Sequence, residues 1–481
     1  MISLHYSAAL FLLLALRCLA DDAQVTQNLE VRLLTPLTSY LRPGSPFQAK
    51  VIGCLQAGCE PVLPVGSVVK GSVRATHSVG LGIRRERALL ELDFRGCNLP
   101  DGQPAPCEAD LVAVDNARER VAPGGRIEGI LAASYPQSWL SGVWFRPTTG
   151  FWSRSVIGLT GASGMMYTRL APNPFMASFI IGSRLALFRL PEPEVKLPAG
   201  TELELKVTGV PPGNREAAPA ETAQVPAELT EWALDQPVEV RMRNGSLAQD
   251  IINLGFAGSA EKVIEAFSAA GWTLSDGLTP RTIARTYAAF SSMSAYPNAP
   301  VSTLHYEGRL PDLVFQKSFN SLAKRHHIRL WMVQTPAGPA WLGAATHDVA
   351  ITVDWNRASL THRIDPQIDR EREKVLNDLS YAGCVAGLSR LERPNVARGP
   401  ADGGRIVTDG TLAAVVLRPC RPAPERGEDL PPLKHSMAAL GARRVILETR
   451  HYLIRGNAYY LAYRGARWSV ASRRQTSVLD E

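Results

Sequence analysis

The sequence predicts two folded domains, an all-β barrel or sandwich-like domain followed by an α+β domain. In the first 209 residues, short β-branched segments alternate with turn residues at the spacing of a compact β structure. A proline-rich segment follows, and beyond it strand-like segments alternate with amphipathic helices. We therefore expect a signal peptide at residues 1–20, a β-rich domain at 21–209, a linker at 210–228 and an α+β domain at 229–481.

The composition is that of a folded chain. Of the 481 residues, 45% are hydrophobic and 20% are charged, which excludes disordered and fibrous proteins. The length allows two or three domains of ordinary size. The apolar segment 175–188 is interrupted by Gly182 and Arg184, so it predicts a buried core helix rather than a membrane span.

The N-terminus has the features of a secretory signal. Residues 8–16 are apolar but too few to cross a bilayer, and Cys18 and Ala20 place small residues three and one before Asp21. We expect cleavage after Ala20 and an exported protein of the periplasm or cell envelope. Retention of the segment as a membrane anchor is the alternative.

Six cysteines remain after such a cleavage. They fall into three local pairs, which are Cys54 with Cys59, Cys97 with Cys107, and Cys384 with Cys420. An even set of cysteines in an exported chain favours disulfides. A zinc site is the alternative interpretation, although no pair has the two-residue gap of a zinc knuckle.

The β-rich domain is predicted from its apolar segments and turns. The expected strands are residues 29–34, 47–53, 68–75, 88–94, 110–114 and 202–207. The related sequences LPVGS at 63–67 and LPAGT at 197–201 each predict a turn that leads into a strand. The mixed-charge segments 84–87 and 115–120 are interpreted as solvated faces.

The second domain begins with a strand–helix unit. A strand is expected at 251–256, followed by a helix with Ser259 as N-cap that ends at Gly271. Asp365 is expected to cap a second helix, whose apolar stripe contains Ile368, Val375 and Leu379. The strands expected between the helices are 302–306, 313–316, 327–333, 340–346 and 349–353.

The basic charge is concentrated near the C-terminus. The formal net charge is +7, and the last 41 residues contain eight Arg against three acidic residues. We expect a hairpin there, with strands at 445–455 and 458–463 around a Gly456-Asn457 turn. In an exported protein these charges favour contact with an anionic membrane surface or envelope polymers, and no nucleic-acid partner is expected.

Several motifs occur in the order found in one family. They are AYPNAPVS at 295–302, GRLPDLVFQ at 308–316, RHHIRLW at 325–331, WLGAATHD at 341–348 and THRIDPQIDRER at 361–372. About residues 245–420 thereby resemble the LssY C-terminal domain. The family takes its name from a protein encoded with a bacterial type I secretion system. The resemblance implies a bacterial envelope protein and implies no particular reaction.

Titratable residues are dense between positions 325 and 372. The candidates for a catalytic or polar site are His327, His347, Asp348, His362, Asp365 and Asp369. A His/carboxylate metal site is also compatible with this set.

Local geometry restricts which of these residues can meet. Because His326 and His327 are neighbours on a strand, they face opposite sides and at most one of them joins a given site. On the second helix, Glu371 and Lys374 are expected to form a solvent-exposed ion pair, and Arg372 can pair with Asp369.

Two classes of function remain open, and whether the protein is an enzyme is not decided. The first is a non-enzymatic interaction or secretion-accessory module that binds envelope proteins or polymers. The second is a periplasmic hydrolase that uses a His/carboxylate pair from residues 325–372. Sequence templates for a nucleophile elbow, a phosphate-binding loop, a dinucleotide fold and a metalloprotease helix are missing from the chain, and no cofactor is expected.

Overall fold

The computed structural model describes residues 25–130, 192–209, 225–420 and 436–450. Within these ranges, residues 57, 117, 244, 246, 293–294, 319–323, 336–337, 355–358, 394–395, 397–398 and 402–405 are not described. The expected signal peptide, the expected core helix at 175–188 and most of the linker lie outside the described residues. No helix among the residues that the structure describes is both long enough and apolar enough to cross a membrane.

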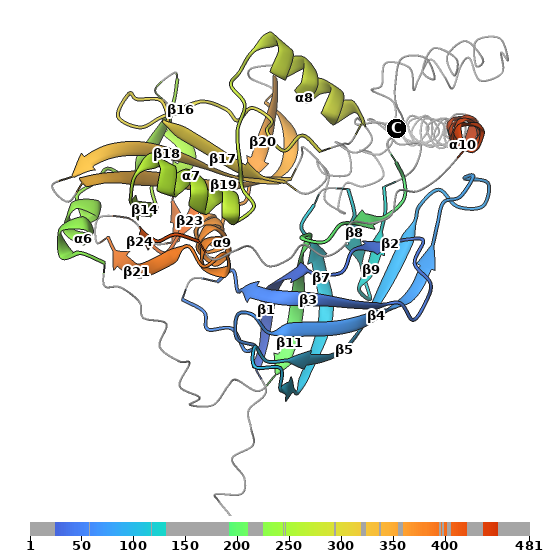
Figure 1. Cartoon of the computed structure of the whole chain (residues 1–481). Coiled ribbons are helices and arrows are strands. Elements are labelled where there is room, and N and C mark those ends of the chain that lie inside the picture. The colour runs from blue at the N-terminus through green and yellow to red at the C-terminus, as the bar shows by residue number, and fades with distance from the viewer. Residues whose placement is uncertain are drawn as a thin grey trace, which may run out of the picture.

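The N-terminal domain is a nearly closed β-barrel, drawn in blue and cyan in Figure 1 except for its green strand β11. Its nine-stranded sheet has the order β7-β11-β1-β3-β4-β5-β9-β8, with β6 beside β5. The strands of this sheet are β1 (Val25–Leu33), β3 (Pro46–Gly53), β4 (Val68–His77), β5 (Leu89–Asn98), β6 (Pro104–Ala105), β7 (Cys107–Val114), β8 (Arg120–Ala122), β9 (Arg126–Glu128) and β11 (Glu202–Gly209). A short pair, β2 (Leu37–Thr38) and β10 (Lys196–Leu197), forms a separate ladder.

Strand β7 brings the two ends of the sheet together. It is hydrogen-bonded to β11 and also contacts β5 and β8 at the other end of the strand order. The Cys97–Cys107 disulfide joins β5 to β7 across this closure. The barrel interior is filled by alternate side chains such as Leu29, Val31 and Leu33, as expected for strands with one buried face. The all-β prediction is confirmed.

The two LPxGx sequences form the same turn. Ser67 N–H donates to the Pro64 carbonyl and Thr201 N–H donates to the Pro198 carbonyl, at 3.0 and 3.1 Å. Within these turns, Gly66 and Gly200 adopt φ angles of 94° and 91°, a backbone conformation that is strained for residues with a side chain.

The C-terminal domain is built on a mixed eight-stranded sheet. The order is β15-β17-β18-β19-β14-β24-β21, with β20 beside β19. The strands are β14 (Leu254–Ala257), β15 (Thr273–Leu274), β17 (Leu313–Lys317), β18 (Arg325–Thr335), β19 (Gly338–Asp354), β20 (Ser359–Ile364), β21 (Val385–Glu392) and β24 (Thr411–Leu417). A small sheet contains β12 (Glu239–Met242), β13 (Leu247–Ile251) and β16 (Leu304–His305), and β22 (Gly399–Ala401) pairs with β23 (Ile406–Thr408).

Two different layers cover this sheet. Helices α7 (Ala260–Ala269) and α9 (Ile368–Tyr381) pack on one face, in a core that includes Phe267, Phe315 and Val375. Helix α6 (Ala227–Leu234) and the small sheet cover the other face, around Trp331 and Val240. The α+β prediction is therefore confirmed.

Some elements differ from those expected. The strand expected at 251–256 is split into β13 and β14, and the two strands expected at 340–353 are one continuous strand, β19. Helix α9 has Gln367 as its N-cap, two residues after the expected Asp365. Asp365 instead accepts a hydrogen bond from Gln367 N–H at 3.0 Å. Helix α8 (Pro280–Ser292) was not expected at all.

The prediction of a hairpin near the C-terminus is wrong for the residues that the structure describes there. Residues 437–450 form helix α10 (Met437–Arg450) instead of a strand. Helical spacing brings Arg443 and Leu447 to the same side. Leu447 is buried in the barrel core and Arg443 pairs with Glu192 at 3.0 Å. Tertiary packing on the barrel thus selects the helix.

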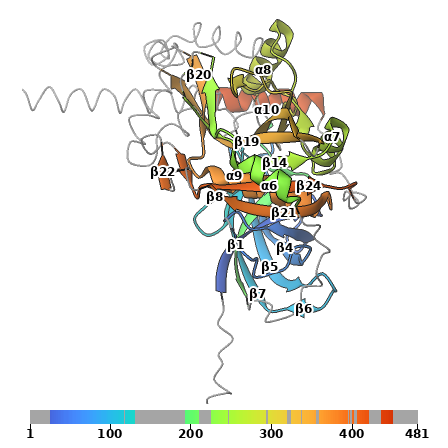
Figure 2. The same cartoon turned by 90° about the vertical axis from the view of Figure 1, so that its left-hand side faces the viewer.

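The two domains meet along helix α9. Figures 1 and 2 both show α9 between the barrel strands and the C-terminal sheet. Asn377 of α9 donates from Nδ2 to the Cys54 carbonyl at 3.0 Å, next to the Cys54–Cys59 disulfide. Gly53 permits this approach, because a Cβ atom there would lie 2.4 Å from the Asn377 side chain. The third disulfide, Cys384–Cys420, joins the segments at the ends of β21 and β24.

Candidate functional site

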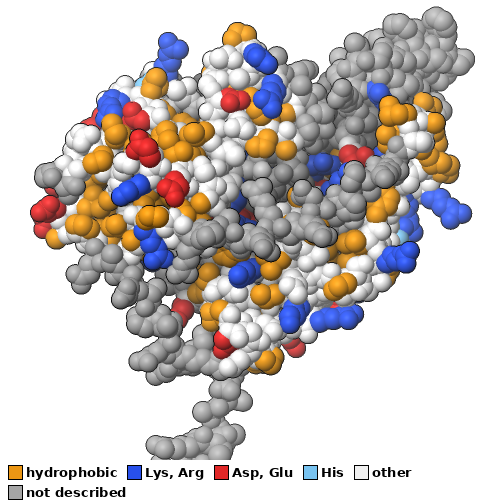
Figure 3. All heavy atoms as spheres, in the orientation of Figure 1, with side chains coloured by type: hydrophobic (Ala, Val, Ile, Leu, Met, Phe, Trp, Pro, Cys, Tyr) orange, Lys and Arg blue, Asp and Glu red, His pale blue; other side chains and the backbone are white. Residues whose placement is uncertain are grey.

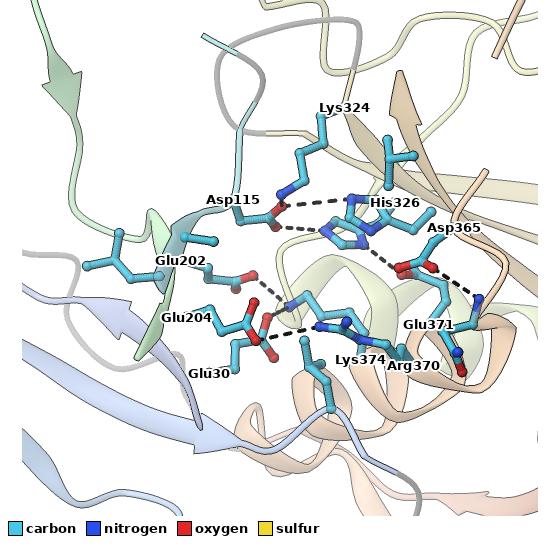
Figure 4. A pocket seen from close by; sticks show the side chains of 16 residues that line it. Glu30, Asp115, Glu202, Glu204, Lys324, His326, Asp365, Arg370, Glu371 and Lys374 are labelled. Atoms are coloured by element: carbon cyan, nitrogen blue, oxygen red, sulfur yellow. Dashed lines mark hydrogen bonds and ion pairs between the residues drawn. The ribbon is translucent and has the colours of Figure 1, made fainter. Parts of the chain in front are cut away.

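A polar pocket lies between the barrel and the C-terminal domain. It has a volume of about 220 Å³ and is lined from the barrel by β1, β11 and the end of β7, and from the other domain by β18, β19 and α9. Figure 4 shows that the labelled side chains of both domains point into the same space. The pocket is therefore formed only when the two domains are docked.

Two histidines form the wall contributed by the C-terminal sheet. His326 of β18 lies directly opposite His347 of β19 in the antiparallel register. Their rings are stacked, with centroids 4.2 Å apart and an interplanar angle of 18°. Because side chains alternate along a strand, this pairing places both rings on the face that also packs against α9.

His326 is held between two carboxylates from different domains. Its Nδ1 lies 2.7 Å from Glu371 Oε2 on α9, and its Nε2 lies 2.7 Å from Asp115 Oδ2 after β7. Burial lowers the pKa of His326, but the charges and hydrogen bonds of Glu371 and Asp115 outweigh burial and raise it to about 10. At neutral pH His326 is therefore an imidazolium ion that joins the two domains.

His347 is in the opposite electrostatic state. Burial, together with the positive charges of His326 and Lys324, holds the pKa of His347 well below its usual value. Its Nε2 atom is buried, has no hydrogen-bond partner and lies 3.9 Å from Asp115 Oδ1. His347 is thus a neutral imidazole with an unused nitrogen facing the carboxylate.

Asp115 is the barrel's main contribution to this cluster. Its Oδ1 forms an ion pair with Lys324 Nζ at 2.8 Å. Although burial alone would raise the pKa of Asp115, Lys324 and His326 hold it well below its usual range. The carboxylate therefore stays ionised. The ligand atoms of Asp115, His326 and His347 all lie within 4.8 Å of one another, so this set can hold a metal ion.

Next to the histidines, a buried ion network crosses the domain boundary. Lys374 Nζ of α9 lies 2.6 Å from Glu202 Oε2 and 2.9 Å from Glu30 Oε1, both on barrel strands. Lys317 Nζ of β17 lies 2.7 Å from Glu202 and 2.8 Å from Asp378. All five side chains are at most 6% exposed, so water does not screen these charges.

The carboxylates of this network differ in their electrostatics. Burial raises the pKa of Glu30 to about 8, against the attraction of Lys374. In contrast, Lys317, Lys374 and Arg32 outweigh burial at Glu202 and hold its pKa well below the usual range. Arg32 adds a second link, because its Nη2 lies 2.7 Å from Glu202 and 2.9 Å from Asp378.

The residues selected from the sequence do not form one cluster. His347 and Asp365 line the pocket. His327 and Asp348 are buried on the opposite face of the sheet, where His327 Nε2 lies 2.6 Å from Thr346 Oγ1. The Arg325 guanidinium contacts Asp348 there at 2.9 Å.

The two remaining candidates lie elsewhere. Asp369 accepts hydrogen bonds from Arg372 at 3.0 Å and from Asp409 N–H at 2.6 Å, so the expected Arg372–Asp369 pair is present. The backbone of His362 pairs with Ile351 in the β19–β20 ladder. The side chain of His362 lies outside the described residues.

Three central residues were not among the six selected from the sequence, although His326 and Glu371 belong to the titratable stretch 325–372 from which the six were chosen. His326 alternates with Ile328 and Leu330, both in the core beside α9, and this alternation is a signal that could have placed it. Glu371 lies three residues after the buried Ile368, which is core spacing on a helix. Asp115 comes from the other domain, and no local pattern predicts that contact.

Two expectations about exposure are wrong. Glu371 and Lys374 do not form a solvent-exposed pair, since they are 3% and 1% exposed. Glu371 is paired with His326 of its own domain, and Lys374 is paired with Glu30 of the barrel. The segment 115–120 is not simply a solvated face, because Asp115 lines the pocket and Glu119 is buried. Both errors arise because docking of the second domain covers surfaces that would be exposed on an isolated domain.

The protonation state of His326 predicts how stability depends on pH. The pKa is about 10 in the folded protein and about 6.5 for an unperturbed histidine. The resulting stabilisation is complete below about pH 6.5 and is lost as the pH rises through about 10, with a slope approaching 1.4 kcal/mol per pH unit.

The measurement is urea unfolding between pH 6 and 9.5 with EDTA present. His326→Gln should flatten the decline in the free energy of unfolding, and His77→Gln, outside the pocket, should leave it unchanged. Equal slopes in wild type and His326→Gln would contradict the assignment of an imidazolium ion.

Comparison with known proteins identifies only one part of the chain. A search of curated proteins found no match. Residues 236–412 match the family model described as the LssY C-terminus. This range begins before β12 and ends in β24, so it contains the histidine pair, α9 and most of the mixed sheet but none of the barrel. Within the α+β domain, residues 236–412 are thus similar to the LssY C-terminus family.

Proposed function

We propose that this protein is an exported, non-enzymatic module of the bacterial cell envelope, in which the barrel and the α+β domain act together as one interaction scaffold. The observation that carries the proposal is the set of buried ion pairs that joins His326, Lys374 and Lys317 to carboxylates of the barrel. These contacts engage His326, Lys374 and Lys317 in holding the two domains together.

Three disulfides support export. Each pair of cysteines predicted from the sequence is bonded: Cys54–Cys59, Cys97–Cys107 and Cys384–Cys420. Structural disulfides persist in oxidising compartments and are rare in the bacterial cytoplasm. Together with the signal-like residues 1–20, they favour the periplasm or the cell envelope.

The electrostatics of the pocket argue against a general acid–base hydrolase. An efficient general base has a pKa near the working pH. The pKa of His326 is about 10 and that of His347 is well below 6.5, so neither histidine exchanges a proton readily near pH 7. Of the other candidates, His327 and Asp348 are buried on the far side of the sheet from this pocket.

The expected partners are envelope proteins or polymers, including those of a secretion system. On the face shown in Figure 3, the described Lys and Arg side chains of the C-terminal domain are interspersed with acidic and hydrophobic ones. Such a mixed surface suits a protein or glycan contact better than a polyanion. The basic residues beyond position 450 remain the candidate contact for an anionic membrane surface.

Export can be tested by the redox state of the cysteines in a bacterial host. The full chain should fractionate with the periplasm or envelope and should react with a thiol-labelling polymer only after reduction. A matched chain lacking residues 2–20 should stay in the cytoplasm and be labelled without reduction. A full chain that stays cytoplasmic and is labelled without reduction would defeat the export proposal.

The non-enzymatic role predicts a structural effect of histidine replacement. His327→Ala should lower the free energy of unfolding by about 1–3 kcal/mol, because it removes a buried partner of Thr346. Wild type and His347→Ala should be equally inactive toward model ester, phosphate, peptide and glycoside substrates. Turnover by the wild type that is lost in a stably folded His347→Ala variant would show that the protein is a hydrolase.

A further inference from the structure

The pocket contains a set of metal-ligand types that the ion pairs do not fully use. Asp115 reaches it from the barrel, and His326 and His347 reach it from adjacent strands of the other domain. A carboxylate with two imidazoles is a common donor set for zinc and related transition metals. We propose that Asp115, His326 and His347 bind one divalent transition-metal ion, with Zn²⁺ the best match, and that the ion links the two domains.

The distances are compatible with such a site. The three ligand atoms lie within 4.8 Å of one another, and the closest pair, His326 Nε2 and Asp115 Oδ2, is 2.7 Å apart. A tetrahedral ion with bonds of about 2.0–2.1 Å separates its ligand atoms by about 3.3 Å. Small rotations of the side chains bring all three atoms into the first coordination shell. His326 then releases its Nε2 proton to solvent as the metal binds, because only the unprotonated nitrogen is a ligand.

A second carboxylate, that of Glu371, already orients His326 toward the proposed site. Glu371 accepts from His326 Nδ1 at 2.7 Å, which directs His326 Nε2 toward Asp115. Ligating histidines usually bond a carboxylate through the other ring nitrogen in this way, because the contact fixes the tautomer and orients the ring. Glu371 is 3% exposed and comes from α9, so the helix that joins the domains also orients the ligand.

His347 provides an independent observation. Its Nε2 is buried without a hydrogen-bond partner, and the nearest carboxylate oxygen, on Asp115, is 3.9 Å away. An unsatisfied buried nitrogen is costly, and a metal ion at this point would satisfy it. The pocket volume of about 220 Å³ leaves room for a fourth ligand such as water.

Lys324 is the competitor for this position. Its ammonium group lies 2.8 Å from Asp115 Oδ1, and its side chain is 21% exposed at the edge of the cluster. A metal ion would displace this contact, and the exposed side chain can turn into solvent. The proposal goes beyond the scaffold role and does not depend on it, because a metal link suits an enzyme as well as an interaction protein.

The test uses the full chain purified without a histidine tag and stripped of metal with EDTA. Calorimetric titration with Zn²⁺ should give one site per chain, and Zn²⁺ should raise the melting temperature. Mg²⁺ at the same concentration should do neither, because it prefers oxygen ligands. Asp115→Asn and His347→Gln should weaken Zn²⁺ binding at least about 100-fold, and Glu371→Gln about 10- to 100-fold.

Two further variants make the result specific to this cluster. Asp110→Asn, an exposed change on the same strand β7, should bind Zn²⁺ like the wild type. Lys324→Met should bind about fivefold more tightly, the factor for removing a competing ion pair of about 1 kcal/mol. Circular dichroism of each metal-free variant checks folding. Absence of Zn²⁺ binding by the wild type, or equal affinity in Asp110→Asn and a folded Asp115→Asn, would overturn the proposal.

Discussion

The arrangement of this protein depends on charges buried between its two domains. Glu202 of the barrel is fully buried and lies within 2.7 Å of nitrogen atoms on Arg32, Lys317 and Lys374. A buried carboxylate is tolerable only with such partners, because the cost of removing it from water is large. Two of these partners belong to the other domain, and separating the domains would break their contacts with Glu202. The constraint explains why α9, rather than a more apolar helix, lies at the interface.

The same constraint positions the pocket. The network fixes α9 through Lys374 and Asp378, and Glu371 one turn earlier then fixes His326. Asp115 reaches His326 only because the barrel is docked on that helix. The properties of the two histidines, one charged and one neutral, thus follow from the docking of the domains rather than from the local sequence.

Much of the fold was predictable because it depends on local patterns. Alternation identified the barrel strands, and the apolar stripe of Ile368, Val375 and Leu379 identified α9. The LPxGx turns and the disulfides Cys54–Cys59 and Cys97–Cys107 were predictable because their contacts are close in sequence. Cys384 and Cys420, 36 residues apart, were paired because they are the two cysteines of the second half of the chain. Family motifs further identified the second domain.

The site was less predictable, because its parts come from both domains. Asp115 and His326 are 211 residues apart in sequence, and neither residue carries a local signal of that contact. Lys374 and Glu371 matched the pattern of an exposed helical ion pair, and only the docked barrel makes them buried. Helix α10 was mistaken for a strand because the contacts that anchor it, those of Leu447 and Arg443, are made to the barrel and leave no local pattern.

The most direct test of this account is a double-mutant cycle between Glu202 and Lys374, with the disulfides intact. Glu202→Gln, Lys374→Met and the double variant are unfolded in urea and their free energies of unfolding are compared. The account predicts a coupling energy of about 1.5–3 kcal/mol, against about 0–1 kcal/mol for the exposed Arg74–Glu91 pair within the barrel. Coupling below about 0.5 kcal/mol between Glu202 and Lys374 would show that buried charge does not hold the domains together.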